Sequence, residues 1–242
     1  MIDAEKELAK AVKAFWQTRT RQLGPKTDPN VPHAGSRGAV VGGRHADGFV
    51  KLIATIVKEA GLPNAEIRYQ QRNAAQIPGY FRPSKAWDLV VVCGTNLVAA
   101  VEVKSQVGSF GNNFNNRVEE LLGNATDFWA AYSKGTFKPS QRPWLGFIFM
   151  LQEHENSLRD TGEIRLEPFG VDPAFQRRSY AKRYELVCER LVRERLYDAA
   201  CFVMSRSDTG RKGAYLQPNT ELGVVPFARS LHAHVAAFSE VV

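Results

Sequence analysis

The chain has 242 residues, of which 44% are hydrophobic and 24% charged, and its formal net charge is +7 at pH 7. This length and hydrophobic fraction suffice for one large domain with a real core, and we expect residues 1–242 to form a single α/β domain. The positive charge favours a polyanionic partner, with nucleic acid ahead of a membrane surface. No stretch approaches the ~18 apolar residues of a membrane span, so an integral membrane protein is excluded.

Three cysteines, Cys93, Cys188 and Cys201, are far apart in the sequence, and each lies among apolar residues. Their odd number and wide spacing exclude a CxxC zinc site and predict reduced, buried thiols, as in a cytoplasmic protein. The first residues, Met1–Lys13, carry charges through an amphipathic pattern that is not that of a signal peptide. We therefore expect a cytoplasmic location.

The periodicity of apolar residues and the positions of Gly and Pro predict helices and strands in chain order. The pattern predicts a helix over 2–23, a loop over 24–43, a helix over 44–60, a short strand over 66–72, a hairpin over 88–104, a loop over 108–116, a helix over 115–132, a strand over 144–151, a polar loop over 152–173, a charged helix over 174–197, a strand over 200–205 and a helix over 227–241. Such mixing of helices and strands indicates an α/β architecture.

The hairpin over Asp88–Lys104 is the most informative segment of the chain. Two apolar runs flank Gly94-Thr95-Asn96, and a Gly-containing loop of three residues is a common hairpin connection. If these three residues form the loop, Cys93 pairs with Leu97. The same register then carries Asp88 to the position opposite residue 102 of the second strand.

Strand alternation places chemically active groups on one face of this hairpin. Directly opposite residues point to the same side, so Asp88 and Glu102 lie together. Lys104 follows Glu102 by two residues and returns to that face, whereas Val101 and Val103 point into a core. The sequence thus predicts two carboxylates and one amine in a group.

Two neighbouring carboxylates repel each other, and a divalent cation between them removes that repulsion. Mg²⁺ prefers oxygen ligands, so Asp88, Glu102 and the backbone carbonyl of Val103 are candidate ligands for metal-dependent phosphodiester hydrolysis. Lys104 would orient or deprotonate the attacking water, or offset charge on the phosphorane, and the sequence leaves these roles open. The alternative is an exposed hairpin face with an ordinary Glu and Lys.

The pattern Asp88…Glu102-Val103-Lys104 resembles the PD-(D/E)xK nuclease motif, with Trp87 where that motif often has Pro. Longer segments more narrowly resemble the XhoI family of type II restriction endonucleases. These segments are WDLVVV at 87–92, AVEVKSQVGSFGNNFNNRVEE at 100–120, GGRHADGF at 42–49 and PWLGFIFML at 143–151.

The resemblance covers most of the chain and implies a restriction-endonuclease-like core, a mixed central sheet flanked by helices. It implies Mg²⁺-dependent double-strand cleavage of DNA by a homodimer, at a short palindrome such as CTCGAG. On the matching positions, Asp88 and Glu102 become metal ligands and Lys104 the catalytic lysine. The alternatives are another nuclease of this fold that repairs DNA or resolves junctions, and a non-catalytic DNA-binding protein of the same fold.

An Asn-rich segment that follows the second hairpin strand supplies candidates for reading DNA. Asn pairs with adenine and Arg with guanine, so the candidates are Asn112, Asn113, Asn115, Asn116 and Arg117. For Arg117 a phosphate contact is expected rather than a base contact. The alternative is a capping loop in which Asn115 caps the helix.

A second basic group lies in the charged helix, where four residues lack acidic neighbours and are candidates for phosphate contacts: Arg177, Arg178, Lys182 and Arg183. Later in the helix, acidic residues alternate with Arg190, Arg193 and Arg195, which predicts surface ion pairs. A solvated helix face remains the alternative for the first four. Three acids, Asp47, Glu119 and Glu120, are either supporting groups near the metal or plain helix-surface residues.

Overall fold

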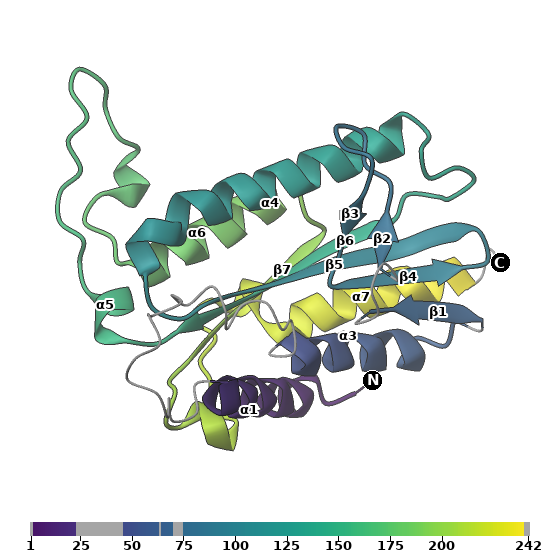
Figure 1. Cartoon of the computed structure of the whole chain (residues 1–242), viewed down its shortest axis with the longest axis horizontal. Coiled ribbons are helices and arrows are strands. Elements are labelled where there is room, and N and C mark those ends of the chain that lie inside the picture. Colours follow the sequence, from purple (N-terminus) through teal and green to yellow (C-terminus); the bar gives the residue numbers. More distant parts are fainter. Residues whose placement is uncertain (1, 23–45, 63, 70–74, 240–242) are drawn as a thin grey trace, which may run out of the picture.

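A five-stranded sheet with helices on both faces organises the chain in this computed structural model (Figure 1). The structure describes residues 2–22, 46–62, 64–69 and 75–239, so the loop expected over 24–43 lies outside the described residues. The strands of the main sheet are β1 (Ala65–Arg68), β4 (Leu89–Cys93), β5 (Asn96–Gln106), β6 (Trp144–Gln152) and β7 (Ala199–Ser205). A separate two-stranded ribbon consists of β2 (Gln76–Ile77) and β3 (Lys85–Ala86).

The strand order β1-β4-β5-β6-β7 makes the main sheet mixed. β4 pairs antiparallel with both β1 and β5, whereas β5, β6 and β7 run parallel to one another. Parallel strands are covered on both faces, and β6 and β7 are accordingly continuous apolar runs with little exposure. The expected α/β architecture with a mixed central sheet is confirmed.

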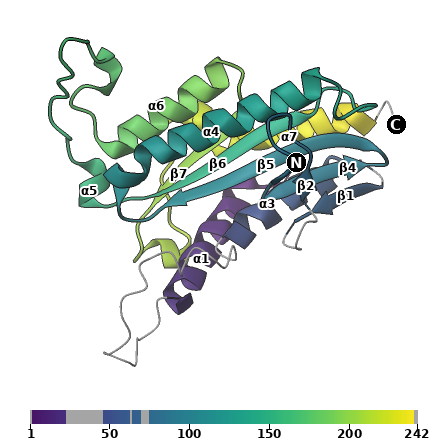
Figure 2. The ribbon, with the colours of Figure 1, turned by 45° about the horizontal axis from the view of Figure 1, so that its top comes forward.

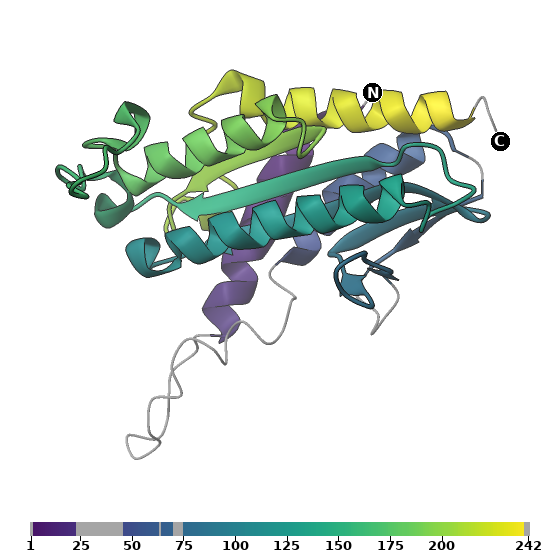
Figure 3. The ribbon, with the colours of Figure 1, turned by 90° about the horizontal axis from the view of Figure 1, so that it is seen from above.

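Helices cover the two faces of the sheet in separate layers (Figures 2 and 3). One layer consists of α1 (Ala4–Gln22), α3 (Asp47–Glu59) and α7 (Val224–Ser239). The other consists of α4 (Phe110–Ser133) and α6 (Tyr180–Arg193). Each layer packs on its own apolar core, so the alternating residues of β4 and β5 divide between two cores. Val101 and Val103 face the core beneath α1, α3 and α7, as predicted.

The loop of the β4–β5 hairpin is one residue shorter than predicted. Cys93 pairs with Asn96 rather than with Leu97, so only two residues connect the strands. A β-bulge then inserts Val98 as an extra residue, and beyond it Leu89 pairs with Val101. The predicted register is therefore wrong at the turn and correct at the other end, where Asp88 and Glu102 lie.

The bulge has a structural reason in the core. Val98 and Ala99 are consecutive, yet both pack into the core beneath α1, α3 and α7. The Val98 carbonyl lies 3.1 Å from Nε2 of His234 in α7, so a side chain of the covering helix meets the backbone at the bulge.

The helix after β5 begins five residues earlier than predicted. Residues 110–116 form the first two turns of α4 and are not a loop, and Asn115 lies inside the helix instead of capping it. Ser109 occupies the N-cap with a left-handed φ of 45° and makes no side-chain cap hydrogen bond. Phe110 is buried and Phe114 is partly buried in the core beneath α4 and α6, and this burial outweighs the weak helix propensity of Gly and Asn.

The charged helix is shorter than the predicted range 174–197. α6 begins after Ser179, whose side chain accepts a hydrogen bond from the Lys182 N–H, and it ends before Arg195, where φ is 58°. The preceding residues form a 3₁₀ turn over Pro173–Phe175 and an irregular segment. A short helix, α5 (Glu155–Leu158), interrupts the predicted polar loop after β6.

Other sequence-based expectations agree with the structure. Cys93, Cys188 and Cys201 are buried, as predicted. Within the described ranges, no helix combines the length and the apolar character that crossing a membrane requires.

Candidate active site

The structure brings Asp88, Glu102 and Lys104 together on the face of the sheet that α4 covers. Glu102 lies in β5 with only 3% of its surface exposed, and its Oε1 is 2.6 Å from the Lys104 Nζ. Asp88 precedes β4, and its Oδ2 accepts a hydrogen bond of 2.7 Å from the Val103 N–H. The hairpin ladder thus positions all three groups, as strand alternation requires.

The carboxyl of Asp88 is in an environment that disfavours its charge. Burial, and after it the negative charge of Glu102, raise the pKa of Asp88 to about 6, although the Val103 N–H and the nearby lysines act in the opposite direction. Two carboxylates in one buried site account for this shift, and a divalent cation would reverse it.

Glu102 and Lys104 remain charged in the same site. Burial favours the neutral form of Glu102, but two ammonium groups outweigh it, so the pKa of Glu102 lies below its ordinary value. Burial likewise works against the Lys104 ammonium, yet Glu102, Glu120 and Asp88 together raise the pKa of Lys104. Lys104 is therefore held as an ammonium, which favours a role in positioning and charge stabilisation over one as a base.

A second lysine contacts Glu102, and the sequence analysis did not identify it. The Nζ of Lys85 lies 2.8 Å from Oε2 of Glu102 and donates a hydrogen bond of 3.0 Å to the Ala86 carbonyl. The same ammonium lies 4.3 Å from the ring centroid of Trp87. The only sequence signal was its position three residues before Asp88, in a segment without a periodic pattern.

The turn that leads into Lys85 is anchored to α4 by one acid. Both oxygens of the buried Asp127 are used: Oδ1 accepts hydrogen bonds from the Tyr80 and Phe81 N–H groups, at 2.8 and 2.7 Å. Oδ2 accepts one from Nε of Arg82 at 2.7 Å. The ribbon β2–β3 is therefore tied down on the side of the sheet where Lys85 meets Glu102.

A chain of ion pairs continues from the site into α4. Lys104 Nζ lies 3.7 Å from Oε2 of Glu120, and that oxygen is 2.7 Å from the Arg117 guanidinium. Glu120 is thus linked to the cluster, whereas Glu119 is exposed on the helix surface. Asp47 is the first residue of α3, on the opposite face of the sheet, and none of the contacts found among the described residues joins it to the cluster.

The helical conformation of residues 110–117 groups the asparagines differently from a loop. Asn112, Asn115 and Asn116 are exposed and spaced three and four residues apart, so they share one face of α4. Asn113 uses its side-chain amide to donate a hydrogen bond of 3.1 Å to the Ser109 carbonyl. Three of the four asparagines are therefore available to a ligand.

Aromatic packing brings the two predicted DNA-binding segments together. The ring of Phe114 in α4 lies 6.5 Å from that of Phe175, 6.4 Å from that of Tyr180 and 5.1 Å from that of Tyr184. The N-terminal turns of α4 and α6 are therefore neighbours, although the two helices begin 70 positions apart, at Phe110 and Tyr180.

The basic residues near the start of α6 differ in how exposed they are. Arg177 and Arg178 are exposed in the segment that precedes the helix. The sequence suggested that Lys182 lacks an acidic neighbour. This is wrong, because its Nζ lies 2.6 Å from Oε1 of Glu185. Arg183 is half-buried, with its guanidinium hydrogen-bonded to the Thr161 hydroxyl. Arg177, Arg178 and Lys182 are thus exposed, and of these three Lys182 forms an ion pair on its own helix.

Two of the three later arginines, Arg190 and Arg193, form ion pairs as predicted. Arg193 pairs with Glu189 at 2.5 Å, within α6. Arg190 pairs with Asp172, an acid of the preceding segment, at 2.5 Å.

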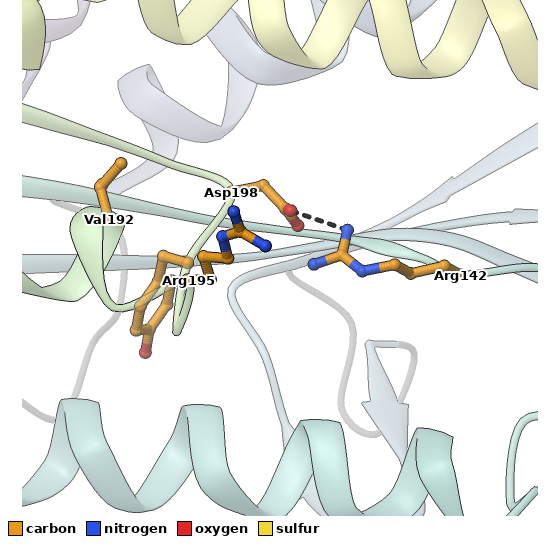
Figure 4. A pocket seen from close by; sticks show the side chains of 5 residues that line it. Arg142, Val192, Arg195 and Asp198 are labelled. Atoms are coloured by element: carbon orange, nitrogen blue, oxygen red, sulfur yellow. Dashed lines mark hydrogen bonds and ion pairs between the residues drawn. The ribbon is translucent and has the colours of Figure 1, made fainter.

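A cavity of about 380 Å³ lies apart from these groups, and Arg142, Val192, Arg195, Tyr197 and Asp198 line it (Figure 4). Arg142 pairs with Asp198 at 2.7 Å, and the other oxygen of Asp198 accepts a hydrogen bond from the Leu145 N–H. These contacts fasten the beginning of β6 to the segment before β7. None of the predicted site residues lines this cavity.

The chain resembles known restriction enzymes over most of its length. A family model described as restriction endonuclease XhoI matches residues 27–217. The type II restriction enzyme BstVI of Geobacillus stearothermophilus is 44% identical over 208 residues, which cover 84% of this chain and 92% of the relative. The type II restriction enzyme XhoI of Xanthomonas vasicola is 42% identical over 182 residues, or 75% and 72% of the two chains. AbrI of Azospirillum brasilense, also a type II restriction enzyme, is 42% identical over 158 residues, or 65% and 70%.

No solved structure matches this chain significantly. The match to the family model nevertheless spans far more than half of the residues, and the mixed sheet agrees with a restriction-endonuclease-like core. The resemblance suggested by the longer sequence segments is confirmed: the chain belongs to the XhoI family of restriction endonucleases.

Proposed function

We infer that this protein is a type II restriction endonuclease that cleaves both strands of DNA with Mg²⁺ at a short palindrome, and that residues 1–242 form one nuclease domain. Membership of the family supports the site-specific deoxyribonuclease activity. The observation that carries the chemistry is the buried pair of carboxylates, Asp88 and Glu102, with Lys104 beside them.

The residues present fit a hard divalent ion. The Asp88 carboxyl is raised in pKa largely by burial and by Glu102, and an ion between the two would relieve this repulsion. No group of three His, Cys, Asp or Glu side chains suited to a metal occurs among the described residues. Two carboxylates and a backbone carbonyl, completed by water and a phosphate, are the set that Mg²⁺ accepts. Asp88, Glu102 and the Val103 carbonyl would hold it.

When bound, Mg²⁺ polarises the scissile phosphate and lowers the pKa of a coordinated water. The protein's own groups complete the site. The Lys104 ammonium donates hydrogen bonds toward the reacting phosphate and offsets negative charge that develops there, and the burial of the site strengthens this effect. Glu120, itself paired with Arg117, restrains Lys104 from the side of α4.

Two neighbouring segments supply the contacts to DNA. The exposed face of Asn112, Asn115 and Asn116 is proposed to read base edges in the major groove, which admits a helix. Arg177 and Arg178 are proposed to contact phosphates, together with Lys182, which is also exposed, and the half-buried Asn113, Arg117 and Arg183. Because Phe114 packs against the start of α6, one stretch of duplex can meet both segments.

The two-fold symmetry of a palindromic site matches that of a dimer, so the active species is proposed to be a homodimer with one site for each strand. The resemblance to the XhoI family suggests CTCGAG as the recognition sequence. A protective methyltransferase on a separate chain would accompany such an enzyme.

The direct test is plasmid cleavage with Mg²⁺, followed by sequencing of the fragment ends. Discrete fragments that end at one palindrome support the proposal and reveal the cut stagger. Smeared products or nicks at junctions and damage would indicate a repair or junction nuclease instead. DNA binding without cleavage under any metal condition would indicate a non-catalytic relative.

A substitution at Glu102 connects the activity to this site. Glu102→Gln keeps the side-chain size but removes a charged ligand, and we expect it to lower the cleavage rate at least ~1000-fold while DNA binding persists. The matched control is Glu189→Gln, which breaks an ion pair with Arg193 on α6. Cleavage by Glu102→Gln at the rate of the control would refute the assignment.

A further inference from the structure

Glu102 is held by two lysines, and only Lys104 belongs to the nuclease motif. Lys104 Nζ lies 2.6 Å from Oε1, and Lys85 Nζ lies 2.8 Å from Oε2, so each carboxylate oxygen has its own ammonium. The side chain of Lys85 is 11% exposed, against 23% for that of Lys104. Lysines are seldom buried to this degree without a fixed partner, so the position of Lys85 is a specific feature of the site.

The surroundings of Lys85 fix its ammonium from several sides. Besides Glu102, the ammonium contacts the Ala86 carbonyl and the ring of Trp87. The turn before Lys85 is fastened to α4 through Asp127, which accepts three hydrogen bonds from it. The chain therefore delivers a second cation to Glu102 from a ribbon that is independent of the β4–β5 hairpin.

This arrangement would have a consequence if Glu102 ligated a metal. A cation at Glu102 would compete with Lys85 and Lys104 for the carboxylate oxygens and would be repelled by both ammonium groups. If Lys85 were displaced, its ammonium would keep only the Ala86 carbonyl and the Trp87 ring as partners, and both are weaker than an anion. A phosphate arriving at the site would supply the missing anion.

We propose that Lys85 is a second catalytic lysine, which neutralises Glu102 before the metal binds and then donates a hydrogen bond to the scissile phosphate. This inference rests on the proposed nuclease function. Lys85 transfers no proton in this role: it stays an ammonium and offsets the charge that develops on the phosphate oxygens. A purely structural Lys85 would instead serve only to hold Glu102 in place.

The test uses Lys85→Met, which keeps the length and the apolar stem of the side chain but removes the charge. The first readout is the affinity for Mg²⁺ alone, without DNA, by titration calorimetry. We expect binding to become tighter by on the order of tenfold, because a competitor for Glu102 has gone. The second readout is the single-turnover cleavage rate at saturating Mg²⁺, which we expect to fall ~100-fold or more.

The sign of the first readout separates the two roles. If Lys85 only positions Glu102, its removal leaves Mg²⁺ binding weaker or unchanged, and either result overturns the proposal. Tighter Mg²⁺ binding with a cleavage rate like that of the wild type would also overturn it, because the contact to phosphate would then be absent. The control is Lys10→Met, which removes a lysine paired with Glu7 on α1, against the opposite face of the sheet.

A second variant covers the case in which Lys85→Met fails to fold. The amide of Lys85→Gln can still donate to the Ala86 carbonyl without a charge, and the same two changes are expected from it. The wild type separates this inference from the proposed function. If the wild type binds no Mg²⁺ and cuts no DNA, the nuclease assignment fails. If the wild type does both and each Lys85 variant binds Mg²⁺ and cuts DNA as the wild type does, only the role of Lys85 fails.

Discussion

At the scale of single residues, Asp88 shows how the site acts against the stability of the fold. Its pKa is raised to about 6 from an ordinary 3.8, so at intermediate pH the folded protein binds a proton that the unfolded chain releases. A group with a raised folded-state pKa stabilises the fold below its unfolded pKa, and this contribution is lost as pH rises through the folded pKa. Above about pH 6 the charge therefore costs folding on the order of 2–3 kcal/mol.

Asp88→Asn should stabilise the metal-free protein while it abolishes cleavage. At about pH 8 we expect the free energy of unfolding to rise by roughly 1–3 kcal/mol, because the amide carries no charge and still accepts the hydrogen bond from the Val103 N–H. Near pH 5 the gain should shrink, because Asp88 is then largely protonated in the folded state. Urea unfolding with EDTA at both pH values measures the difference, and equal gains at both would contradict the explanation.

Some site residues could be predicted from the sequence, and others could not, for a physical reason. Asp88, Glu102 and Lys104 follow from strand alternation around one hairpin, which a local pattern encodes. Lys85 lies in a strand of two residues, too short for any periodicity, and its position depends on how the ribbon folds over β5. Its contact with Glu102 is made by tertiary packing, which no local sequence pattern encodes.

At the scale of elements, the start of α4 shows burial overriding local propensity. Gly and Asn predict a loop, but Phe110 and Phe114 lie four residues apart on the side of the helix that packs against α6. Recognising this spacing would have moved the asparagines onto a helix face.

The contact between α1 and α3 depends on a glycine. A Cβ added to Gly48 would lie 2.8 Å from the Ala11 Cα and 2.9 Å from the Ala11 carbonyl oxygen, both of them backbone atoms. We expect Gly48→Ala to push the helices apart and to lower the free energy of unfolding by about 1–3 kcal/mol.

A second glycine provides the matched control. Gly123 is also helical, in α4, and nothing lies within 4 Å of an added Cβ. Gly123→Ala should therefore raise the free energy of unfolding by roughly 0.5–1 kcal/mol. Thermal and urea unfolding of both variants test the pair, and a shift in the same direction would show that the proximity of α1 and α3 is not what matters at Gly48.

At the scale of the whole molecule, the net charge of +7 acts through particular surfaces. Arg177 and Arg178 are exposed beside the start of α4, so their joint replacement by Ala should weaken DNA binding about equally for all sequences. The slope of log K against log salt should also become less steep by about 2, since each phosphate contact contributes ~0.9.

The control for this experiment removes two charges elsewhere. Lys134 and Lys138 are exposed beyond the other end of α4, and their joint replacement by Ala should leave the salt slope near that of the wild type. Fluorescence anisotropy with labelled duplexes over a series of salt concentrations provides the slopes. If both double variants lower the slope equally, the binding surface is diffuse and is not centred on the start of α6.

The bulge at Val98 separates the geometry of the loop from that of the other end of the hairpin, where Asp88 and Glu102 lie. Gly94 and Thr95 are exposed at the tip, and the strand pairing beyond the bulge is set by core contacts of Val98 and Ala99. A short epitope or fluorophore-labelling peptide inserted between Gly94 and Thr95 should therefore leave cutting intact. Such a tag would give single-molecule studies a reporter on a working enzyme without disturbing its reaction centre.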